Sequence, residues 1–157
     1  MSVKIRQAVR ADCSRMMELV HELAHYEKSP QEVTVEFDHF VNSGFSENPV
    51  WWAYVAEVTL DNNVSTIVGF ALYYIRYSTW KGKRIYLEDI VVTEKMRGKG
   101  IGTLLFNKIL DVSSSLEYCG ISWQVLDWNT DAIKFYNKFP GLAMDVAWIN
   151  CSINNNL

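Results

Sequence analysis

Apolar and polar residues follow two different periods along the chain, and the first residues display both. At 3–9 apolar residues alternate with charged ones, which predicts an edge strand. From 16 to 23 apolar residues recur at helical spacing. Asp12 stands where a helix cap is expected, and the helix should end near Lys28, ahead of a proline. The amino terminus therefore predicts a strand followed by an amphipathic helix.

A second helix and a hairpin are predicted next. Thr34 is expected to cap the helix and Gly44 to end it, with apolar side chains on one side between them. The stretches 51–59 and 65–77 are rich in aromatic and β-branched residues, and Asp and Asn at 61–63 supply turn chemistry between them. This arrangement predicts an antiparallel pair of strands.

The middle of the chain predicts a strand, a glycine-rich turn and a helix in direct succession. Residues 84–92 form a mostly apolar run that Glu88 and Asp89 interrupt, so this strand is expected to be central and covered on both faces. Residues 100–116 carry apolar side chains at helical spacing. Because two carboxylates are unusual in a buried strand, this region is the expected centre of a site.

The last third of the chain predicts a strand at 120–126, a short helix capped by Thr130 and a closing strand at 143–153. We expect one domain over 1–157, since the chain has no repeat or linker. Strands and helices in this order predict an α+β fold with a mixed, mostly antiparallel central sheet flanked by helices.

Composition and charge narrow the possible functions. The formal net charge is −3, which argues against nucleic acid as a partner and suits a cationic substrate. No stretch has the apolar length of a transmembrane helix or a signal peptide, so we expect no membrane association. The three cysteines are widely spaced and form no Cys-x-x-Cys pair. The sequence therefore predicts neither a disulfide framework nor a zinc knuckle, and a cytoplasmic location.

The turn at 97–102, Arg-Gly-Lys-Gly-Ile-Gly, stands between the predicted strand and helix. Backbone N–H groups at a helix amino terminus favour an anion, and glycines let the backbone approach a phosphate closely. The spacing is not that of a P-loop, and the turn follows an antiparallel meander rather than the first strand of a parallel sheet. ATP and dinucleotide sites are therefore disfavoured, and a different phosphate-bearing ligand is predicted.

These residues carry a resemblance to the GNAT superfamily of N-acetyltransferases. The run Arg97-x-x-Gly100-x-Gly102 after a strand looks like the acetyl-CoA pyrophosphate signature, and Tyr86-Leu87-Glu88-Asp89 sharpens the match toward the spermidine/spermine and thialysine acetyltransferases. Further matches follow in order over most of the chain: Glu22-Leu23-Ala24, Tyr26-Glu27, residues 68–74, Trp80, Trp128-Asn129 and Phe135-Tyr136.

The resemblance implies transfer of acetyl from acetyl-CoA, the co-substrate, to a primary amine of a polyamine, diamine or thialysine-like amino acid. The amine would attack directly in a ternary complex, and no metal would take part. Main-chain groups of the last strand residues would hold the pantetheine arm and the acetyl group. The residues implied to bind the cofactor are Ile90, Val91, Val92, Arg97, Gly98, Lys99, Gly100, Ile101, Gly102, Thr103, Asn129 and Tyr136.

Glu88 and Tyr136 are the expected catalytic residues. A lysine-type amine has a pKa of about 10.4, so a base must take its proton, and Glu88 is the candidate, directly or through water. Tyr136 is the candidate acid for the leaving thiolate, since a phenol has a pKa of about 10. A buried ion pair for Glu88 and a core position for Tyr136 remain open. The residues expected to bind the amine are Tyr26, Glu27, Trp80, Glu88 and Asp89.

A competing pattern is His-Glu-x-x-His at 21–25, which on a helix places two imidazoles on one face for zinc and supplies a Glu as base. Glu36 or Glu47 would then complete the ligands of a metallopeptidase. The charge of Glu27 and the match of this segment to an acetyltransferase helix favour two exposed histidines instead.

Two further alternatives and the assembly stay open. A CoA-binding module without turnover would need neither Glu88 nor Tyr136. Acetylation of protein lysines or amino termini would need an open groove. The resemblance implies a homodimer, although the short segment after Phe139-Pro140-Gly141 departs from the polyamine enzymes and puts the dimer contact in doubt.

Overall fold

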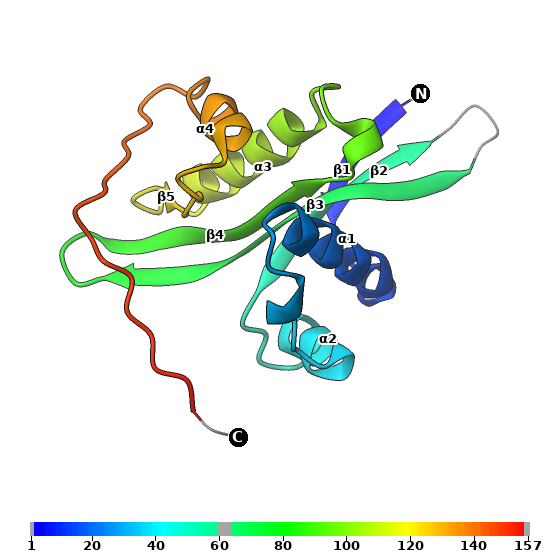
Figure 1. Ribbon diagram of the computed structural model, residues 1–157, viewed down its shortest axis with the longest axis horizontal. Helices are drawn as coiled ribbons and strands as arrows, with labels where there is room; N and C mark the ends of the chain where they lie inside the picture. The colour runs from blue at the N-terminus through cyan, green and yellow to red at the C-terminus, as the bar shows by residue number, and fades with distance from the viewer. Residues whose placement is uncertain (1, 60–63, 156–157) are drawn as a thin grey trace. The chain divides into compact units, whose positions relative to one another are not determined.

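The protein is described by a computed structural model at residues 2–59 and 64–155, which fall into two compact units, 1–123 and 124–157. The first unit contains the five-stranded sheet (Figure 1). The second contains a short helix. The expectation of one domain over the whole chain stays a prediction, and the turn predicted at 61–63 lies outside the described residues.

The sheet has the order β1-β2-β3-β4-β5 and is antiparallel except for the parallel pair β4 and β5. This confirms the predicted α+β fold with a mixed, mostly antiparallel sheet. The strands span β1 (Ser2–Gln7), β2 (Trp52–Thr59), β3 (Ser65–Ser78), β4 (Gly82–Val92) and β5 (Ile121–Ser122).

Helices α1 (Cys13–Tyr26) and α2 (Phe37–Phe45) lie on one face of the sheet, and α3 (Ile101–Ser115) lies on the other (Figure 1). The buried core between α1, α2 and the sheet includes Cys13, Met16, Leu19, Phe40, Val55, Phe70, Leu72 and Val91. On the opposite side α3 buries Ile101, Leu105, Phe106 and Ile109. No helix in the described ranges is long and apolar enough to cross a membrane.

Both helix caps predicted in the first unit are wrong. Asp12 directly precedes α1, but its carboxylate accepts the N–H of Val9 at 2.8 Å and binds Arg6 instead of capping the helix. Helix α2 begins after Glu36, so Thr34 lies too far ahead to cap it. The error at Asp12 arises because Asp can make several local hydrogen bonds, and here Arg6 and the N–H of Val9 occupy its carboxylate.

Gly44 lies inside α2 rather than at its end, at the point where Trp51 packs against the helix. A Cβ built on Gly44 would lie 2.3 Å from Cζ2 of Trp51. The same ring stacks on Phe40 with centroids 4.9 Å apart and meets Phe45 edge-on at 5.5 Å. The glycine therefore makes room for an aromatic cluster.

Gly44→Ala is expected to lower the free energy of unfolding by about 1–3 kcal/mol, because the added methyl group overlaps a ring held on both sides. Thermal unfolding followed by circular dichroism measures this, with Asn42→Ala on the exposed side of the same helix as the control. Helix propensity alone predicts a gain of about 1 kcal/mol for Gly44→Ala, so a higher Tm would contradict the packing argument.

The second unit contains α4 (Thr130–Tyr136), and its cap is Asn129 rather than Thr130, since the Asn129 side chain accepts the N–H of Ala132 at 3.2 Å. The strand predicted at 120–126 is reduced to the two residues of β5. No strand forms at 143–153. Side chains there such as Val146 are exposed, so the apolar composition that predicted a closing strand is not matched by burial.

Candidate active site

A β-bulge in β4 explains why charged residues interrupt a central strand. Leu72 of β3 pairs with Asp89, and the next residue, Tyr73, pairs with Leu87. Glu88 is therefore an extra residue in the ladder. A bulge of this kind disrupts the regular alternation and re-aims the side chains beside it.

The bulge directs both carboxylates to the face of the sheet that α1 covers. Leu72 belongs to the core on that face, and Asp89 lies directly opposite it. The charge of Glu88 acts on Tyr74 and Tyr86, which face each other across the same side of the hairpin with ring centroids 5.1 Å apart. Two consecutive acidic side chains thus serve one site.

Glu27, directly after α1, completes an acidic cluster with these two residues. Burial, then the charges of Glu88 and Glu27, raise the pKa of Asp89 to about 7. Burial also raises the pKa of Glu27. Glu88 itself is exposed, contrary to the buried position expected from its strand. Neither Glu88 nor Asp89 forms an ion pair with a Lys, Arg or His side chain in the described part of the chain. The cluster is therefore suited to attract a cation.

Tyr26 and Arg97 connect the end of α1 to the glycine turn. The guanidinium carbon of Arg97 lies 4.9 Å from the centroid of the Tyr26 ring, and Arg97 Nε donates to the carbonyl of Val92 at 2.9 Å. A cation–π contact and a hydrogen bond thus hold this arginine against the end of β4. A predicted amine-binding residue and a predicted cofactor-binding residue meet here.

The turn into α3 has the backbone of an anion site. A short 3-10 turn, η3 (Glu94–Met96), is followed by Gly98 and Gly100 with φ of 72° and 80°. Residues that carry a side chain rarely adopt this left-handed backbone conformation, so glycine is needed at both positions. Gly100 is the residue before α3, and no side chain caps the helix. The first N–H groups of a helix, here at 101–103, lack helical acceptors and can bind an anion.

The edge of β4 beyond Tyr86 is open on the side of β5. In the described residues β5 pairs with β4 only at Ile85 and Tyr86. The N–H and C=O groups of 90–92 on this side therefore have no strand partner, and such an edge can bind an extended group. On the other side β3 approaches closely, since a Cβ on Gly69 would lie 2.5 Å from the carbonyl oxygen of Val91.

Glu22 of the His-Glu-x-x-His pattern has structural partners. Thr93 Oγ1 donates to Glu22 Oε2 at 2.7 Å, and Arg15 Nη2 donates to Oε1 at 3.2 Å. His21 and His25 are exposed, and the described residues contain no group of three or more His, Cys, Asp or Glu that could hold a metal. Glu22 therefore ties α1 to the connection between β4 and α3, which disfavours a role as the base of a metallopeptidase.

Three of the predicted site residues do not lie at the acidic cluster within the first unit. Trp80 is 88% exposed at the turn of the β3–β4 hairpin, about 20 Å along β4 from Glu88 at the usual rise of a strand. Asn129 and Tyr136 belong to the second unit, where Tyr136 is buried and meets Phe135 edge-on at 5.2 Å. Their roles in catalysis and binding stay predictions.

Four residues on the α1 side of the hairpin, two tyrosines and two arginines, are not among the predicted site residues. Tyr74 lies opposite Tyr86, and Arg76 lies opposite Arg84. The guanidinium carbon of Arg76 is 5.8 Å from the centroid of the Tyr86 ring. Only the strand register places Tyr74 and Tyr86 beside Glu88 and the two arginines farther along the same face, and an exact hairpin register was the signal that could have found them.

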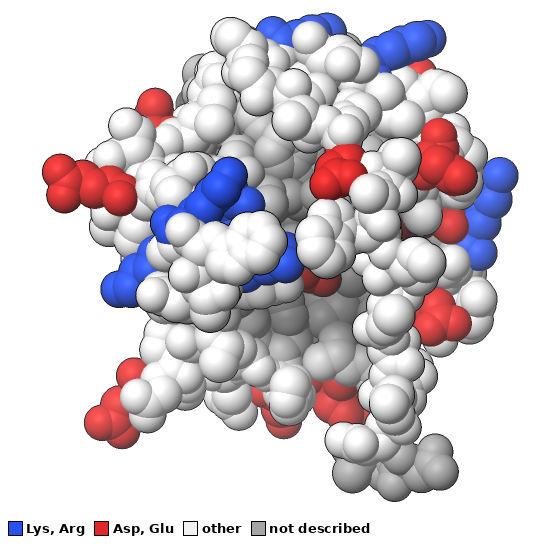
Figure 2. Space-filling model, turned by 90° about the vertical axis from the view of Figure 1, so that its left-hand side faces the viewer, with Lys and Arg blue, Asp and Glu red and all other residues white. Residues whose placement is uncertain are grey.

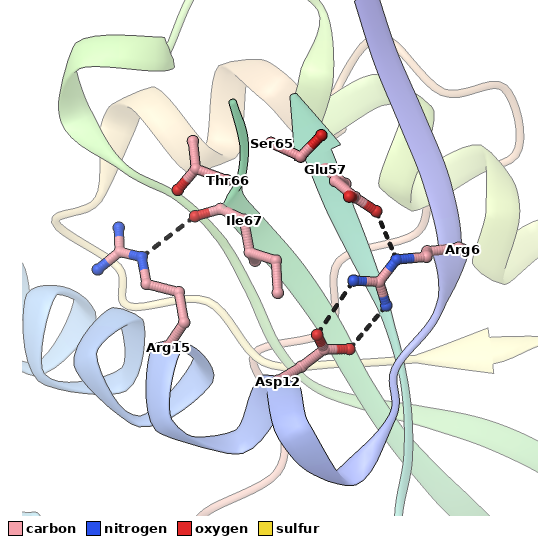
Figure 3. Close-up of a pocket in the computed structure, with 7 residues that line it drawn as sticks. All are labelled: Arg6, Asp12, Arg15, Glu57, Ser65, Thr66 and Ile67. Carbon is pink, nitrogen blue, oxygen red and sulfur yellow. Dashed lines mark hydrogen bonds and ion pairs between the residues drawn. The ribbon is translucent and has the colours of Figure 1, made fainter. Parts of the chain in front are cut away.

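A cavity of about 340 Å³ lies elsewhere, between β1, β2, β3 and α1 (Figure 3). Its charged groups neutralise one another: Arg6 binds Asp12 at 2.7 Å and Glu57 at 2.6 Å. Burial alone would raise the pKa of Asp12, but the hydrogen bonds from Arg6 and Val9 outweigh it and hold the pKa below its ordinary value. The cavity shares no residue with the predicted site and contains a structural ion-pair network.

Comparisons with known proteins agree with this geometry. The sequence matches the profile of the acetyltransferase (GNAT) family over residues 13–141. It is 39% identical to the thialysine N-epsilon-acetyltransferase of Mus musculus over 95% of this chain and 91% of that protein. It is 32% identical to the spermidine/spermine N(1)-acetyltransferase-like protein 1 of Homo sapiens, over 90% of this chain and 21% of that protein.

The fold is also similar to that of an aminoglycoside acetyltransferase from an uncultured soil metagenomic sample. The TM-score is 0.77 at 18% identity, and the alignment covers 97% of each chain. The family profile, the curated relatives and the fold agree with one another and confirm the resemblance first found in the motifs. The chain therefore belongs to the GNAT acetyltransferase family and is an acetyltransferase.

Proposed function

We propose that this chain transfers an acetyl group from acetyl-CoA to the primary amine of a small basic substrate. The observation that carries the proposal is the bulge at Glu88, which directs two carboxylates to the side of the sheet where Glu27 follows α1. The relatives named for thialysine and for spermidine/spermine support an amine of this kind. A cationic amine also fits a cluster of carboxylates without a basic partner.

The residues between β4 and α3 fit the cofactor. The glycines at 98 and 100, the free N–H groups of the first turn of α3 and the side chain of Lys99 suit a pyrophosphate. The open edge at 90–92 suits the amide groups of a pantetheine arm. By the resemblance, Asn129 and Tyr136 are further candidates to contact the cofactor.

The chemistry assigns a proton to each catalytic group. Bound acetyl-CoA would supply a thioester, whose carbonyl carbon forms a bond to the amine nitrogen as the bond to sulfur breaks. Glu88, directly or through water, would take the proton that the ammonium must lose. Tyr136 would donate its phenolic proton to the sulfur, and the second proton, which the nitrogen loses as the amide forms, would return to the Tyr136 phenolate and restore the phenol. Main-chain N–H groups at 90–92 would stabilise negative charge on the carbonyl oxygen.

Asp89 is a second candidate for the proton acceptor, because a base is most effective when its pKa lies near the working pH. With a pKa raised to about 7, Asp89 must lose its proton before it can act. We therefore expect kcat/KM to fall as the pH drops below 7, and this limb of the pH profile to disappear in Asp89→Asn. A limb that persists in Asp89→Asn and disappears in Glu88→Gln would assign it to Glu88.

The proposed function is tested by acetyl-CoA turnover over spermidine, spermine, short diamines, thialysine, lysine and a histone-type peptide, with thiol release as the signal. Acetylation of small amines in preference to the peptide is the expected result. Turnover only with the peptide would favour the protein-lysine alternative. If the folded protein binds CoA and acetylates none of the amines, the proposal fails.

We also propose that the protein acts as a homodimer in the cytoplasm. Closed twofold dimers are the commonest soluble oligomers, and the distance of Trp80 from the carboxylates of its own chain leaves it available to another subunit. Sedimentation equilibrium tests the dimer, and a monomer at micromolar concentration would contradict it.

A further inference from the structure

Helix α1 contacts the connection between β4 and α3 through two side chains that are one helical turn apart. Glu22 Oε2 accepts a hydrogen bond from Thr93 Oγ1 at 2.7 Å. The ring centroid of Tyr26 lies 4.9 Å from the guanidinium carbon of Arg97. Residues four positions apart on a helix share one face, and the two partners on the connection are also four positions apart. The helix and the connection therefore pair twice along their length.

The first of these pairs is held on both sides. Arg15 Nη2 donates to the other oxygen of Glu22 at 3.2 Å, and the N–H of Thr93 donates to the carbonyl of Val68 in β3 at 2.8 Å. The last turns of α1 are thereby tied to the connection and, through it, to the sheet. Because this attachment fixes the direction of the helix, it also fixes where the ring of Tyr26, one turn later, is placed.

Arg97 is exposed, yet its guanidinium is held in one orientation. Its Nε donates to the carbonyl of Val92 at 2.9 Å, and one face of the group lies on the ring of Tyr26. Within residues 2–59 and 64–155 Arg97 forms no ion pair with a carboxylate. An arginine side chain loses rotamer freedom when it binds a ligand, and one that is already ordered loses less. The side chain is therefore prepared to bind an anion through its two terminal nitrogens.

Arg97 directly precedes the glycine turn, whereas a larger group of cations lies elsewhere. Gly98 follows it, and the first N–H groups of α3 are at 101–103. Figure 2, which faces the hairpin end of the molecule, shows Lys and Arg side chains gathered over the tip of β3 and β4, at the opposite end of β4 from Arg97. Phosphate oxygens bound at the turn would therefore meet the guanidinium of Arg97 and not the cations of the tip.

We infer that Tyr26 is a positioning residue for the cofactor, whose ring holds the Arg97 guanidinium in the orientation that binds the pyrophosphate of CoA. The inference rests on the proposed function and adds a residue to its cofactor site. The resemblance implies a contact between Tyr26 and the amine instead. The two roles predict different results when the affinity for the cofactor and the affinity for the amine are measured separately.

Calorimetry with CoA measures the effect on cofactor affinity. Tyr26→Leu keeps an apolar side chain but removes the ring, and is expected to weaken CoA binding by about 3- to 30-fold because the cation–π contact is lost. Tyr26→Phe keeps the ring and should bind CoA as tightly as the wild type. Tyr77→Leu removes an exposed ring from β3, and Lys83→Gln removes an exposed cation from the hairpin tip. Both are controls and should leave the affinity unchanged.

Arg97→Gln provides the reference, because Tyr26 is inferred to act only through this arginine. Arg97→Gln should weaken CoA binding at least as much as Tyr26→Leu does. The double variant should bind CoA no more weakly than Arg97→Gln alone. In turnover with acetyl-CoA and thialysine, Tyr26→Leu should raise KM for acetyl-CoA more than KM for thialysine.

The inference is overturned if Tyr26→Leu weakens CoA binding by the same factor with and without Arg97, since the ring would then act through packing alone. An unchanged CoA affinity in Tyr26→Leu, or a larger rise in KM for thialysine, would also overturn it. Calorimetry does not depend on turnover. Tyr26-dependent CoA binding by a protein that acetylates no amine would keep the positioning role and reject acetyl transfer. Acetylation with a CoA affinity that does not depend on Tyr26 would keep the transfer and reject the role.

Discussion

Tyr136→Phe is expected to lower kcat by about 100- to 10,000-fold while the affinity for CoA stays close to that of the wild type. The change removes only the phenolic oxygen and keeps the ring that packs against Phe135. The thiolate would then have to leave without a proton donor. Thiol-release kinetics measure kcat, and calorimetry with CoA measures the affinity.

The control for this variant is Tyr77→Phe, which removes the same atom from a residue that is 69% exposed on β3. It should leave both quantities unchanged. If Tyr136→Phe weakens CoA binding as much as it slows turnover, Tyr136 has a packing role and another group protonates the sulfur.

Asp89→Asn is expected to make the protein more stable than the wild type above pH 7, by about 2–4 kcal/mol. In the folded state burial, Glu88 and Glu27 raise the pKa of Asp89 to about 7, from an ordinary value of 3.8. The folded state therefore holds this proton more tightly than the unfolded state. The free energy of unfolding of the wild type must therefore fall as the pH rises from 3.8 to about 7 and then level off. The Asp89→Asn variant shows no such fall, because asparagine does not ionise.

Urea unfolding at about pH 4 and about pH 8 tests this prediction, because the two proteins should differ far less at the lower value. Asp111→Asn changes an exposed carboxylate of α3 and is the matched control. Equal stability of wild type and Asp89→Asn at the higher pH would contradict the prediction, because it would show that ionisation of Asp89 does not lower the free energy of unfolding. The expected gain also means that the native carboxylate is retained for function at the expense of stability.

The periodicity of the chain predicted the strands and helices that position the site. Helical spacing at 16–23 and after Gly100 corresponds to α1 and α3, and the apolar run at 84–92 corresponds to β4. These predictions succeed because long elements with one buried face leave a strong pattern in the sequence. The glycines of the turn were predicted to let the backbone approach a phosphate, and the structure adds that Gly98 and Gly100 have positive φ angles, which only glycine adopts readily.

The details that depend on contacts between distant residues could not be read from the sequence. Glu88 and Asp89 were noticed as unusual, but the bulge that directs both to one face depends on the pairing of β3 with β4. The role of Gly44 depends on Trp51, and Asp12 takes Arg6 as its partner rather than the helix. The apolar tail at 143–153 resembles a strand in composition, yet composition does not supply a partner strand.

The extra residue at Glu88 divides β4 into two segments, and the face to which even-numbered side chains point is reversed from one segment to the other. Before it, even-numbered residues such as Arg84 and Tyr86 point to the α1 side, and after it odd-numbered residues such as Asp89 and Val91 do so. Loss or gain of one residue between Gly82 and Leu87 would invert the first segment and exchange its polar and apolar surfaces. In any transplantation of this hairpin, the length of β4 would therefore have to be kept more strictly than the identity of most of its residues.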